Sequence, residues 1–502
     1  MSEPYILAID QGTSATKAVL FDGQGQIAAR ATCPVQSFFP QPGFVEQDPE
    51  ELYQSVLKSA GRCLDMFRQG GRKNKSAAIA ACGISNQRET FLLWDPSGCP
   101  LTNAVVWQCK RSMEICRRFQ ETELAEEVQK RTGLIIDPYF SGTKLIWLCE
   151  NDERIRAAVR AGRACFGTID TWLLQKLTGG RQFCTDYTNA SRTLFFNIDR
   201  LEWDEDLLDR FSLGGLKLPE VRPSSCEFGR SDFEGLLEEP VPISAMIGDS
   251  HAAAFGEGCF TAGTAKATLG TGCSILLNTG SSRTASGQGM VTTICWSTEE
   301  RVDYALEGVI VTCGAAIQWL RDQLGLFAES RETEAMALAA KDNHCVCLIP
   351  AFSGMGTPYW RMDLKAALLG LTFGSDKNHV VRAALESIAF QIKDVLTAME
   401  TESGIAPAAL NADGGITANK FVMQFLADLL NTNVTTLGLE EVSALGAACL
   451  AGLHAGVFES LEALEKLRRK TQVFSPGAGR RQAETACRQY HHYLSLFLGG
   501  TR

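Results

Sequence analysis

The sequence predicts an α/β protein with two structurally related halves. Amphipathic helical segments alternate with short apolar runs of strand length, a pattern typical of sheets covered by helices rather than of bundles or sandwiches. Two such runs joined by a turn containing Gly and Thr occur near the start of the chain and again roughly 260 residues later. This repeat favours two related halves, and two unrelated hairpins are the alternative that the pattern leaves open.

The first half is expected to begin with a hairpin and to continue with alternating helices and strands. An apolar run at 5–9 stops at the turn 10–14, and a second run at 17–21 ends at Asp22-Gly23. Further along, periodic or continuous apolar positions predict helices over 52–67 and 121–130 and strands over 77–84 and 241–247.

The second half repeats the hairpin at 265–269 and 274–277, on either side of a Gly-Thr-Gly turn, and long helical patterns follow at 380–399 and 421–430. No Pro/Ser-rich linker separates the halves, so we place the boundary at a tight hinge near Gly248. The expected division is a domain over 1–248, a domain over 249–460, and a charged helical tail over 461–502 that packs on the second domain.

Composition and charge exclude several classes of function. Hydrophobic residues make up 45% of the chain and charged residues 21%, as in an ordinary globular protein. The net charge of −10, without a Lys/Arg-rich run, argues against nucleic acid or anionic lipid as a partner. No apolar run reaches the roughly 18 residues of a membrane span, and the first residues lack the features of a secretion signal. We therefore expect a cytoplasmic protein with no nucleic-acid partner and no membrane insertion.

The 18 cysteines are scattered from Cys33 to Cys487 and form neither a CxxC pair nor a zinc-ligand pattern. A chain of this length does not need disulfides to stabilise its core. We expect most of these residues to be reduced and buried, as small hydrophobic side chains.

The two Gly/Thr turns suggest a site for a polyphosphate. Glycine allows close approach of the backbone, successive N–H groups bind anions, and Thr13 and Thr271 add hydroxyl donors. Neither turn has the GxxxxGK[ST] pattern of a P-loop, and each alone is compatible with a simple turn. Asp10 would face bound phosphate, which is unfavourable unless the carboxylate holds a divalent cation, so Mg²⁺ is implied. A third glycine pair, at 414–415 before a predicted helix, suits a nucleotide or is only a connection.

These three sites resemble the two phosphate loops and the adenosine motif of the fold shared by actin, hexokinase and the seventy-kilodalton heat-shock proteins. That resemblance implies a two-lobed, ribonuclease H-like ATPase fold with a central cleft between the domains. Two longer segments resemble the signatures of the FGGY family of carbohydrate kinases. They are YFSGTKLIWL at 139–148 and the segment 366–386, which contains Gly370-Leu371, His379-Val380 and Ala383-Ala384-Leu385-Glu386.

Within that family the glycerol kinases are the most similar, by SNQRET at 85–90, VWQC at 106–109, DPYF at 137–140 and TDYTNASR at 185–192. The resemblance covers the chain from the first strand to about residue 460. It implies ATP-dependent phosphorylation of glycerol to sn-glycerol 3-phosphate. One alternative is a kinase for a ketose or a larger polyol of four or five carbons. The other is a nucleotide-driven switch of the actin or heat-shock type, which would need no acceptor pocket.

The resemblance implies that the acceptor is bound by Arg88, Glu89, Trp107, Tyr139 and Asp249, and that Asp249 is the general base. A polyol hydroxyl can donate to Glu89 and accept from Arg88, the Trp107 ring covers the carbon skeleton, and Tyr139 adds a phenol. Without the resemblance, Arg88-Glu89 is a surface ion pair, the aromatic residues are core residues, and Asp249 is a helix cap.

The resemblance also assigns nucleotide contacts to both halves, namely Thr13, Ser14, Lys17, Thr271, Gly314, Gln318, Gly415 and Asn419. Lys17 stands where many members of the family have Arg and would meet a phosphate as a point charge. Mg²⁺ would be held by Asp10 and Asp249, through water. His251 receives no catalytic role. A homo-oligomer, either a dimer or a tetramer, is expected as well, and the sequence does not fix which.

Two positions depart from the pattern of the glycerol kinases. Ser250 follows the expected base where those enzymes usually have Gln, and Ser274 follows the second Gly/Thr turn where they usually have Phe. Both shorter side chains would make the acceptor wall wetter and roomier, so we count Ser250 among the acceptor-binding residues and keep a larger polyol in view. The loop 233–240 lacks the Gly- and Arg-containing pattern through which some bacterial glycerol kinases sense fructose 1,6-bisphosphate, and its Glu238 and Glu239 would repel that ligand.

Overall fold

The computed structural model describes residues 4–69, 79–287, 289–438, 441–467 and 472–499. The chain forms two compact units, each assembled from segments that are separated in the sequence. Unit 1 comprises Met1–Gly258, Thr292–Tyr304 and Glu441–Leu467, and unit 2 comprises Cys259–Val291, Ala305–Glu440 and Arg468–Arg502.

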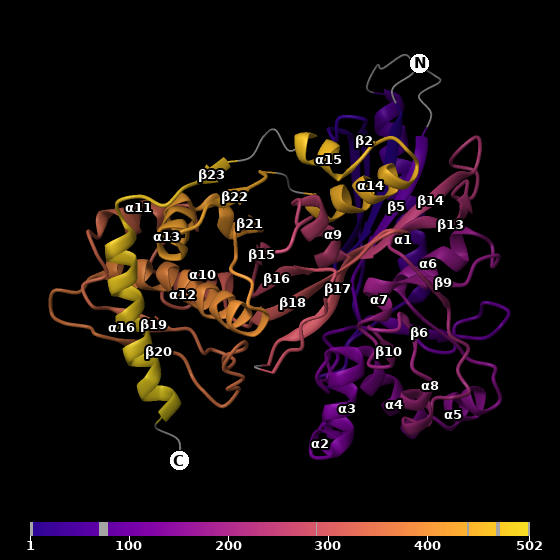
Figure 1. The fold of residues 1–502 in the computed structure, drawn as a ribbon, viewed down its shortest axis with the longest axis horizontal. Helices are drawn as coiled ribbons and strands as arrows, with labels where there is room; N and C mark the ends of the chain where they lie inside the picture. Colours follow the sequence, from indigo (N-terminus) through magenta and orange to yellow (C-terminus); the bar gives the residue numbers. More distant parts are fainter. Residues whose placement is uncertain (1–3, 70–78, 288, 439–440, 468–471, 500–502) are drawn as a thin grey trace. The chain divides into compact units, whose positions relative to one another are not determined.

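Unit 1 is built on a six-stranded sheet in the order β13-β14-β5-β1-β2-β3. Four of these strands, β2, β5, β13 and β14, are labelled in Figure 1. β1 (Tyr5–Gln11) pairs antiparallel with β2 (Ala15–Asp22) and parallel with β5 (Ile79–Asn86), and β14 (Val241–Gly248) pairs parallel with β5. The antiparallel strands β3 (Ile27–Pro34) and β13 (Ser225–Ser231) form the edges. The last residues of the three parallel strands are in register, since Asn86 pairs with both Gln11 and Gly248. The loops that follow these strands therefore meet at one edge of the sheet.

Alternation along β1 places apolar side chains on both faces of this sheet. Leu7 and Ile9 belong to the core with residues of α1 (Pro49–Gln69) and α6 (Ile169–Leu177). Ile6 faces the other side, toward Gly452 of α14 (Val442–His454). Both faces are thus covered by helices, as expected for the predicted α/β class.

α9 (Asp249–Gly256) and α14 pack closely because both are rich in small residues. A Cβ added to Gly256 would lie 2.6 Å from the carbonyl oxygen of Val442, and one added to Gly446 would lie 1.8 Å from that of Ala252. This close packing places both helices in unit 1. In the division into compact units, α9 and residues 441–460 fall in unit 1, whereas the prediction from the sequence places both after the boundary near Gly248.

The other elements of unit 1 include a four-stranded sheet of β4 (Glu46–Gln47), β7 (Ala104–Val105), β6 (Phe91–Trp94) and β8 (Cys165–Thr168). The remaining elements are α2 (Met113–Gln120), α3 (Glu123–Thr132), α4 (Ser141–Asn151), α5 (Glu153–Arg160), α7 (Tyr187–Ala190), α8 (Glu205–Arg210), α15 (Leu461–Leu467), β9 (Cys184–Asp186), β10 (Phe196–Asn197), β11 (Glu202–Trp203) and β12 (Glu220–Arg222).

The second sheet repeats the strand order of the first. Its seven strands run β17-β18-β16-β15-β21-β22-β23, with β15 (Thr264–Leu269) antiparallel to β16 (Cys273–Gly280) and parallel to β21 (Ala409–Asp413). β22 (Val434–Thr436) is parallel to β21 and β23 (Gln472–Phe474) is antiparallel to β22. The sheet is completed by β17 (Val291–Ser297) and β18 (Val302–Ile310). A hairpin, two parallel strands and an antiparallel edge strand thus occur in both sheets, which confirms the prediction of related halves.

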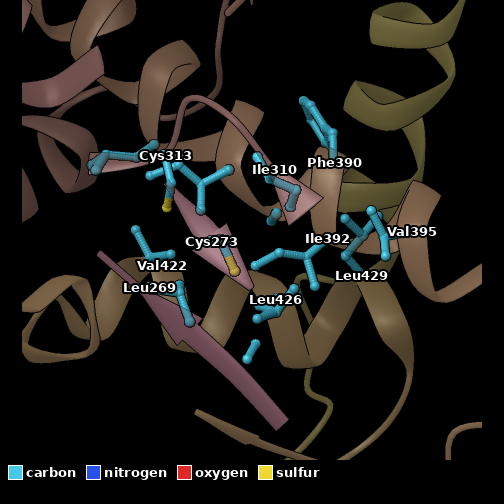
Figure 2. Close-up of a cluster of buried hydrophobic side chains, with 14 of the residues drawn as sticks. Leu269, Cys273, Ile310, Cys313, Phe390, Ile392, Val395, Val422, Leu426 and Leu429 are labelled. Carbon is cyan, nitrogen blue, oxygen red and sulfur yellow. The ribbon is translucent and has the colours of Figure 1, made fainter. Parts of the chain in front are cut away.

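The core of unit 2 lies between this sheet and two helices, α12 (Lys377–Ser403) and α13 (Lys420–Leu430). Figure 2 shows Leu269 and Ile310 of the strands together with Ile392 of α12 and Leu426 of α13, all of them buried. α12 begins with a capping box between Asp376 and His379. The other elements are α10 (Gly314–Asp322), α11 (Glu332–Ala339), α16 (Arg480–Gly499), β19 (Cys347–Ile349) and β20 (Ala367–Leu369).

The segment 461–502 differs from the predicted helical tail. Its first helix, α15, belongs to unit 1, and β23 extends the second sheet through pairing of Phe474 with Val434. Among the described residues 472–499 of unit 2, α16 has the expected helical form, and it packs against α13 and β19. Among the predicted elements, residues 77 and 78 of the strand over 77–84 lie outside the described residues. In the part of the chain that the structure describes, no helix is long and apolar enough to cross a membrane.

Candidate active site

The first group of predicted residues lies where the three parallel strands of unit 1 end. Asp10, near the end of β1, is the register partner of Ser85 in β5, and the Ser85 hydroxyl donates a hydrogen bond of 2.9 Å to Asp10 Oδ1. Loss of hydration on burial raises the pKa of Asp10 to about 6, and the nearby Asp249 and Glu441 carboxylates also favour its protonated form. The Asp10 carboxyl group is thus held in place by Ser85 and lies near the Asp249 and Glu441 carboxylates.

The turn after β1 is fixed from beneath by glutamine side chains. Gln47 Nε2 donates to the Thr13 carbonyl oxygen at 2.6 Å, and Gln87 Nε2 donates to Gln47 Oε1 at 2.8 Å. Within the turn, the Gly12 N–H donates to the Ala15 carbonyl at 3.0 Å. The Ser14 side chain is exposed above this buried amide network. A preorganised turn of this kind can present its N–H groups to an anion without reorganisation.

Lys17 lies on β2, directly opposite Asp10 in the antiparallel pair. Its ammonium pairs with Glu441 Oε2 at 2.7 Å, and Arg30 Nη1 lies 3.6 Å from the other oxygen of the same carboxylate. The side chain of Lys17 is about one third exposed, at 34%. Lys17, which is predicted to contact a phosphate, is therefore paired with the Glu441 carboxylate and lies next to Asp10.

Arg88 and Glu89 are buried, with 5% and 1% of their side chains exposed, which excludes the surface ion pair considered above. Arg88 Nε lies 3.4 Å from Asp249 Oδ1 and 4.0 Å from Glu89 Oε1. Glu89 has φ of 59°, in the left-handed region that non-glycine residues rarely adopt. Gly248 allows Arg88 to pass, because a Cβ at Gly248 would lie 2.6 Å from Arg88 Cγ.

Two aromatic residues of the predicted site contact each other and the charged residues. The rings of Trp107 and Tyr139 meet edge to face with centroids 5.5 Å apart, and Arg88 Nη2 donates to the Tyr139 hydroxyl at 3.4 Å. Trp107 Nε1 donates to Thr13 Oγ1 at 2.9 Å, which links a predicted acceptor-binding residue to the turn predicted to bind phosphate. The Tyr139 backbone is fixed by Lys144, whose ammonium donates to its carbonyl oxygen at 2.7 Å.

Asp249 is the first residue of α9, directly after the end of β14. Its side chain is 39% exposed, and its Oδ1 accepts the Ser250 N–H at 2.6 Å. The carboxylate therefore faces solvent while Arg88 and the Ser250 backbone hold it. His251 is fully buried, with Nε2 3.3 Å from Thr293 Oγ1.

In unit 2, the turn between β15 and β16 forms the same kind of structure as the turn after β1. The Gly270 N–H donates to the Gly272 carbonyl at 2.9 Å, and the exposed Thr271 accepts the Cys313 N–H on its carbonyl at 2.9 Å. Gly314 is the first residue of α10, and its N–H donates to the Gly270 carbonyl oxygen. A Cβ added to Gly314 would lie 2.7 Å from the same oxygen. This contact attaches the start of α10 to the turn.

The remaining predicted nucleotide residues are placed by α10 and by the end of β21. Gln318 is exposed on α10, and Gly415 is exposed with no atom within 4 Å of an added Cβ. Asn419 is used locally, since its Oδ1 caps α13 through the Val422 N–H and its Nδ2 donates to Thr333 Oγ1. Asn419 therefore fixes the helix that follows the Gly414-Gly415 turn.

Ser274 follows the second turn on β16. Its hydroxyl donates to Glu307 Oε1 at 3.4 Å, and the Glu307 side chain is buried. Where the glycerol kinases usually have an apolar ring, this chain therefore places a hydroxyl beside a buried carboxylate.

The donor chemistry at Asp10 fits a hydrated divalent cation. Burial is the main cause of the raised pKa of Asp10, and repulsion by the Asp249 carboxylate adds to it. A cation such as Mg²⁺ prefers one or two carboxylates and keeps its waters. No cluster of three or more His, Cys, Asp or Glu side chains with metal-site geometry occurs among the described residues, so protein ligands alone do not form a closed cage.

The comparisons with known proteins show the family of the chain. The chain belongs to the FGGY family of carbohydrate kinases, whose N-terminal domain model matches residues 5–256 and whose C-terminal domain model matches residues 265–455. Among curated proteins it is 46% identical to the glycerol kinase of Xanthomonas campestris pv. campestris (strain 8004), over 95% of each chain. It is also 46% identical to the glycerol kinase of Brevibacillus brevis, over 98% of this chain and 99% of that one.

Solved structures show the same similarity. A Plasmodium falciparum glycerol kinase with ADP matches with a TM-score of 0.93 and 35% identity, over 98% of each chain. A ligand-bound xylulose kinase from Lactobacillus acidophilus matches with a TM-score of 0.87 at 22% identity, covering 99% of each chain, and shares the fold. The predicted two-domain α/β kinase fold is confirmed.

Sequence reasoning missed the residues that hold the site together. Arg192 donates through Nε to Glu89 Oε1 at 2.6 Å, and both side chains are 1% exposed. The signal was available: a glutamate in a buried motif needs a nearby cation, and TDYTNASR at 185–192 ends in Arg. Gln47 belongs to no recognisable motif, and Gln87 lies within the SNQRET motif without having been assigned a role of its own.

Proposed function

We propose that this protein transfers the γ-phosphoryl group of ATP to glycerol and forms sn-glycerol 3-phosphate. The observation that carries the proposal is the grouping of Arg88, Glu89, Trp107, Tyr139 and Asp249 at the strand ends of unit 1. These side chains offer donors, acceptors and an apolar ring face to a small polyol. A nucleotide-driven switch would have no use for them. The 46% identity to glycerol kinases over nearly the whole chain supports the same conclusion.

In this reaction Asp249 accepts the proton of the attacking hydroxyl as the phosphoryl group transfers in line. Its exposed carboxylate, fixed by Arg88 at 3.4 Å, is the general base. Glu89 accepts a hydrogen bond from an acceptor hydroxyl, Arg88 donates one, and Trp107 covers the carbon chain. Because the transition state is loose, the side chains act mainly by position and charge.

We further propose that the phosphates of ATP are bound by Thr13, Ser14 and Lys17 of unit 1 and Thr271 of unit 2. The nucleotide would also contact Gly314, Gln318, Gly415 and Asn419. Mg²⁺, held by Asp10 and Asp249 through water, would neutralise phosphate charge. Lys17 reaches a phosphate by exchanging the Glu441 carboxylate for it.

A kinase for a larger polyol is the second candidate, and one observation favours it. The Ser274 hydroxyl beside the buried Glu307 carboxylate offers polar partners at a position where the glycerol kinases usually have Phe. An additional carbinol group would find hydrogen bonds with that pair. Ser250 also removes volume at the position of the usual Gln.

The test is ADP formation by the purified protein with Mg-ATP, measured without acceptor and with a panel of glycerol, four- and five-carbon polyols and ketoses. We expect ADP formation to depend on the acceptor and kcat/KM to be highest for glycerol. A four- or five-carbon polyol with the highest kcat/KM would replace glycerol as the substrate. ADP formation indifferent to every acceptor would overturn the kinase proposal and favour a switch.

We propose a cytoplasmic location, supported by the 18 cysteines, all of which are free. Fifteen of them are buried, in agreement with the expected role as small hydrophobic side chains. The expected dimer or tetramer stays a prediction, which light scattering on the purified protein would test.

A further inference from the structure

One buried segment of unit 1, residues 186–192, contacts three of the loops that carry the proposed acceptor-binding residues, namely those of Arg88-Glu89, Tyr139 and Asp249. It consists of Asp186, the short helix α7 and the two residues that follow it, and we call it the bracing segment. Its own conformation is fixed from within: the Asp186 carboxylate accepts the N–H groups of Thr188 and Asn189, at 3.0 and 2.9 Å. Ser224 also donates to Asp186, at 2.7 Å. The segment is therefore a rigid support rather than a loose connection.

The first contact is with the end of β5. The side-chain amides of Asn189 and Asn86 form a reciprocal pair, with hydrogen bonds of 2.9 and 3.0 Å in the two directions. Both side chains are fully buried. Asn86 is two residues before Arg88, so this pair fixes the point from which the Arg88-Glu89 loop starts.

The second contact is electrostatic. Arg192 donates to Glu89 at 2.6 Å, whereas Arg88 Nε lies 4.0 Å from the same oxygen. Arg192 thus supplies the cation that a buried carboxylate requires. Arg88 is left to face Asp249 and the Tyr139 hydroxyl, each at 3.4 Å. The guanidinium of Arg192 also lies over the Phe140 ring, 5.1 Å from its centroid, beside Tyr139.

The third contact is with the residue before the proposed base. The Gly248 N–H donates to Thr188 Oγ1 at 2.9 Å, in a fully buried position. Gly248 is the N-cap residue of α9, which begins with Asp249. Thr188 therefore sets where α9 begins and where the Asp249 carboxylate is presented.

We propose that the bracing segment positions the acceptor-binding residues through two separable contacts: Arg192 holds the Glu89 carboxylate, and Thr188 holds the backbone that carries Asp249. This inference rests on the proposed function. Arg192 and Thr188 are positioning residues that act through Glu89 and Asp249. Loss of the first contact weakens acceptor binding, and loss of the second slows the chemical step.

Arg192→Met and Arg192→Lys test the first contact. We expect Arg192→Met to raise the KM for glycerol about tenfold or more, with kcat and the KM for ATP changed by less than about threefold. Arg192→Lys retains the charge and should restore much of the lost affinity. In a Glu89→Gln background, Arg192→Met should add little further increase, because its target charge is gone.

Arg382→Met is the matched control for a buried arginine. Arg382 also pairs with a buried glutamate, Glu386 at 2.7 Å, and lies over an aromatic ring, that of Phe421 at 5.0 Å. It is in unit 2, where it contacts none of the proposed acceptor-binding residues. We expect this variant to lose thermal stability as Arg192→Met does, with the KM for glycerol unchanged.

Thr188→Val and Thr188→Ser test the second contact, and only the serine retains the acceptor for the Gly248 N–H. Thr188→Val should lower kcat about tenfold or more with a smaller effect on the KM for glycerol, and Thr188→Ser should stay close to the wild type. These variants keep the test decisive if Arg192→Met fails to fold. An active wild type whose folded Arg192→Met variant keeps the wild-type KM for glycerol, or whose Thr188→Val variant keeps the wild-type kcat, would overturn the corresponding positioning contact alone. A wild type without polyol-dependent ADP formation would instead overturn the proposed function, and this role with it.

Discussion

Arg88 Nε lies 3.4 Å from Asp249 Oδ1, although one residue follows β5 and the other begins α9. The two loops meet because their strands are parallel neighbours whose last residues, Asn86 and Gly248, are in register. The proposed base is thereby held beside the proposed acceptor site by sheet topology. The first prediction concerns this carboxylate.

Asp249→Asn should lower kcat by ~10²–10⁴, because the amide cannot accept the proton of the attacking hydroxyl. Its oxygen can still accept from Arg88, so the fold and nucleotide affinity should be nearly unchanged. A coupled assay for ADP and calorimetric titration with ADP would measure the two quantities. Full activity of the variant would remove Asp249 as the base.

Asp10→Asn should make the protein more stable and less active. Burial raises the pKa of Asp10 to about 6 from 3.8, so the folded protein binds this proton more tightly than the unfolded chain does. Ionised Asp10 then costs the folded state on the order of 3 kcal/mol at pH 7. Stability therefore falls as pH rises from about 4 through 6, and above that range the cost is constant.

Thermal unfolding without nucleotide or Mg²⁺ would measure this effect. We expect a higher Tm for Asp10→Asn than for the wild type at pH 7.5, and a smaller difference at pH 5. Turnover with Mg-ATP should fall, since the neutral amide binds a cation poorly. If the wild type and Asp10→Asn have equal Tm values at pH 7.5 and at pH 5, ionised Asp10 does not destabilise the folded state as expected.

Ser274→Phe should narrow the acceptor range. The phenyl ring would replace a hydroxyl beside Glu307, and, with Ser274 on the acceptor wall as the family resemblance implies, it would take up space that a further carbinol group needs. We expect kcat/KM for four- and five-carbon polyols to fall by roughly 10–200-fold relative to glycerol. Ser274→Ala is the control, since it removes the hydrogen bond without adding volume. If Ser274→Phe leaves the ratio of kcat/KM for larger polyols to that for glycerol unchanged, residue 274 does not determine acceptor specificity.

His491→Gln should weaken the attachment of α16 to α12. His491 Nε2 lies 2.6 Å from Asp394 Oδ1, and this hydrogen bond raises the pKa of His491 to about 10. The stabilisation is complete below the ordinary imidazole pKa of about 6.5 and is lost as pH rises through about 10. The Tm difference between wild type and variant should therefore be larger at pH 6 than at pH 10. His492→Gln, an exposed neighbour on α16, should show no such difference.

We expect that fructose 1,6-bisphosphate does not inhibit the enzyme by binding at the loop 233–240. Glu238 and Glu239 are exposed there, and the loop is attached to α1 by a hydrogen bond of 2.7 Å from Tyr53 to Glu234. A polyanion meets two negative charges at this surface. Initial rates with and without millimolar bisphosphate would test this, and inhibition abolished by a substitution in the loop would contradict it.

Much of this arrangement could be predicted because local patterns determine it. The apolar runs that form β1, β2, β15 and β16 are short and bounded by turns, so their pairing follows from adjacency. The helix predicted over 380–399 corresponds to α12, extended at both ends by polar caps that hydrophobic periodicity does not detect. The proposed acceptor-binding residues came from family motifs, and the ends of the parallel strands β5 and β14 explain why Arg88 and Asp249 meet.

The parts that were missed depend on contacts between distant segments. The small, apolar side chains of α14 would suit packing against either sheet. Its sequence therefore does not reveal that Gly446 packs on Ala252. β23 has only three residues, and it forms a strand because it pairs with β22. The partnership of Arg192 with Glu89 likewise links residues that no periodicity connects.

The packing of α14 against α9 bears on how the chain matures during synthesis. The helix that presents Asp249 is covered by residues 442–454, which leave the ribosome after nearly all of unit 2 has been translated. A nascent chain that has released only its first 258 residues lacks the partner of that helix. The acceptor half should therefore stay incomplete, and exposed to chaperones, until translation is almost finished.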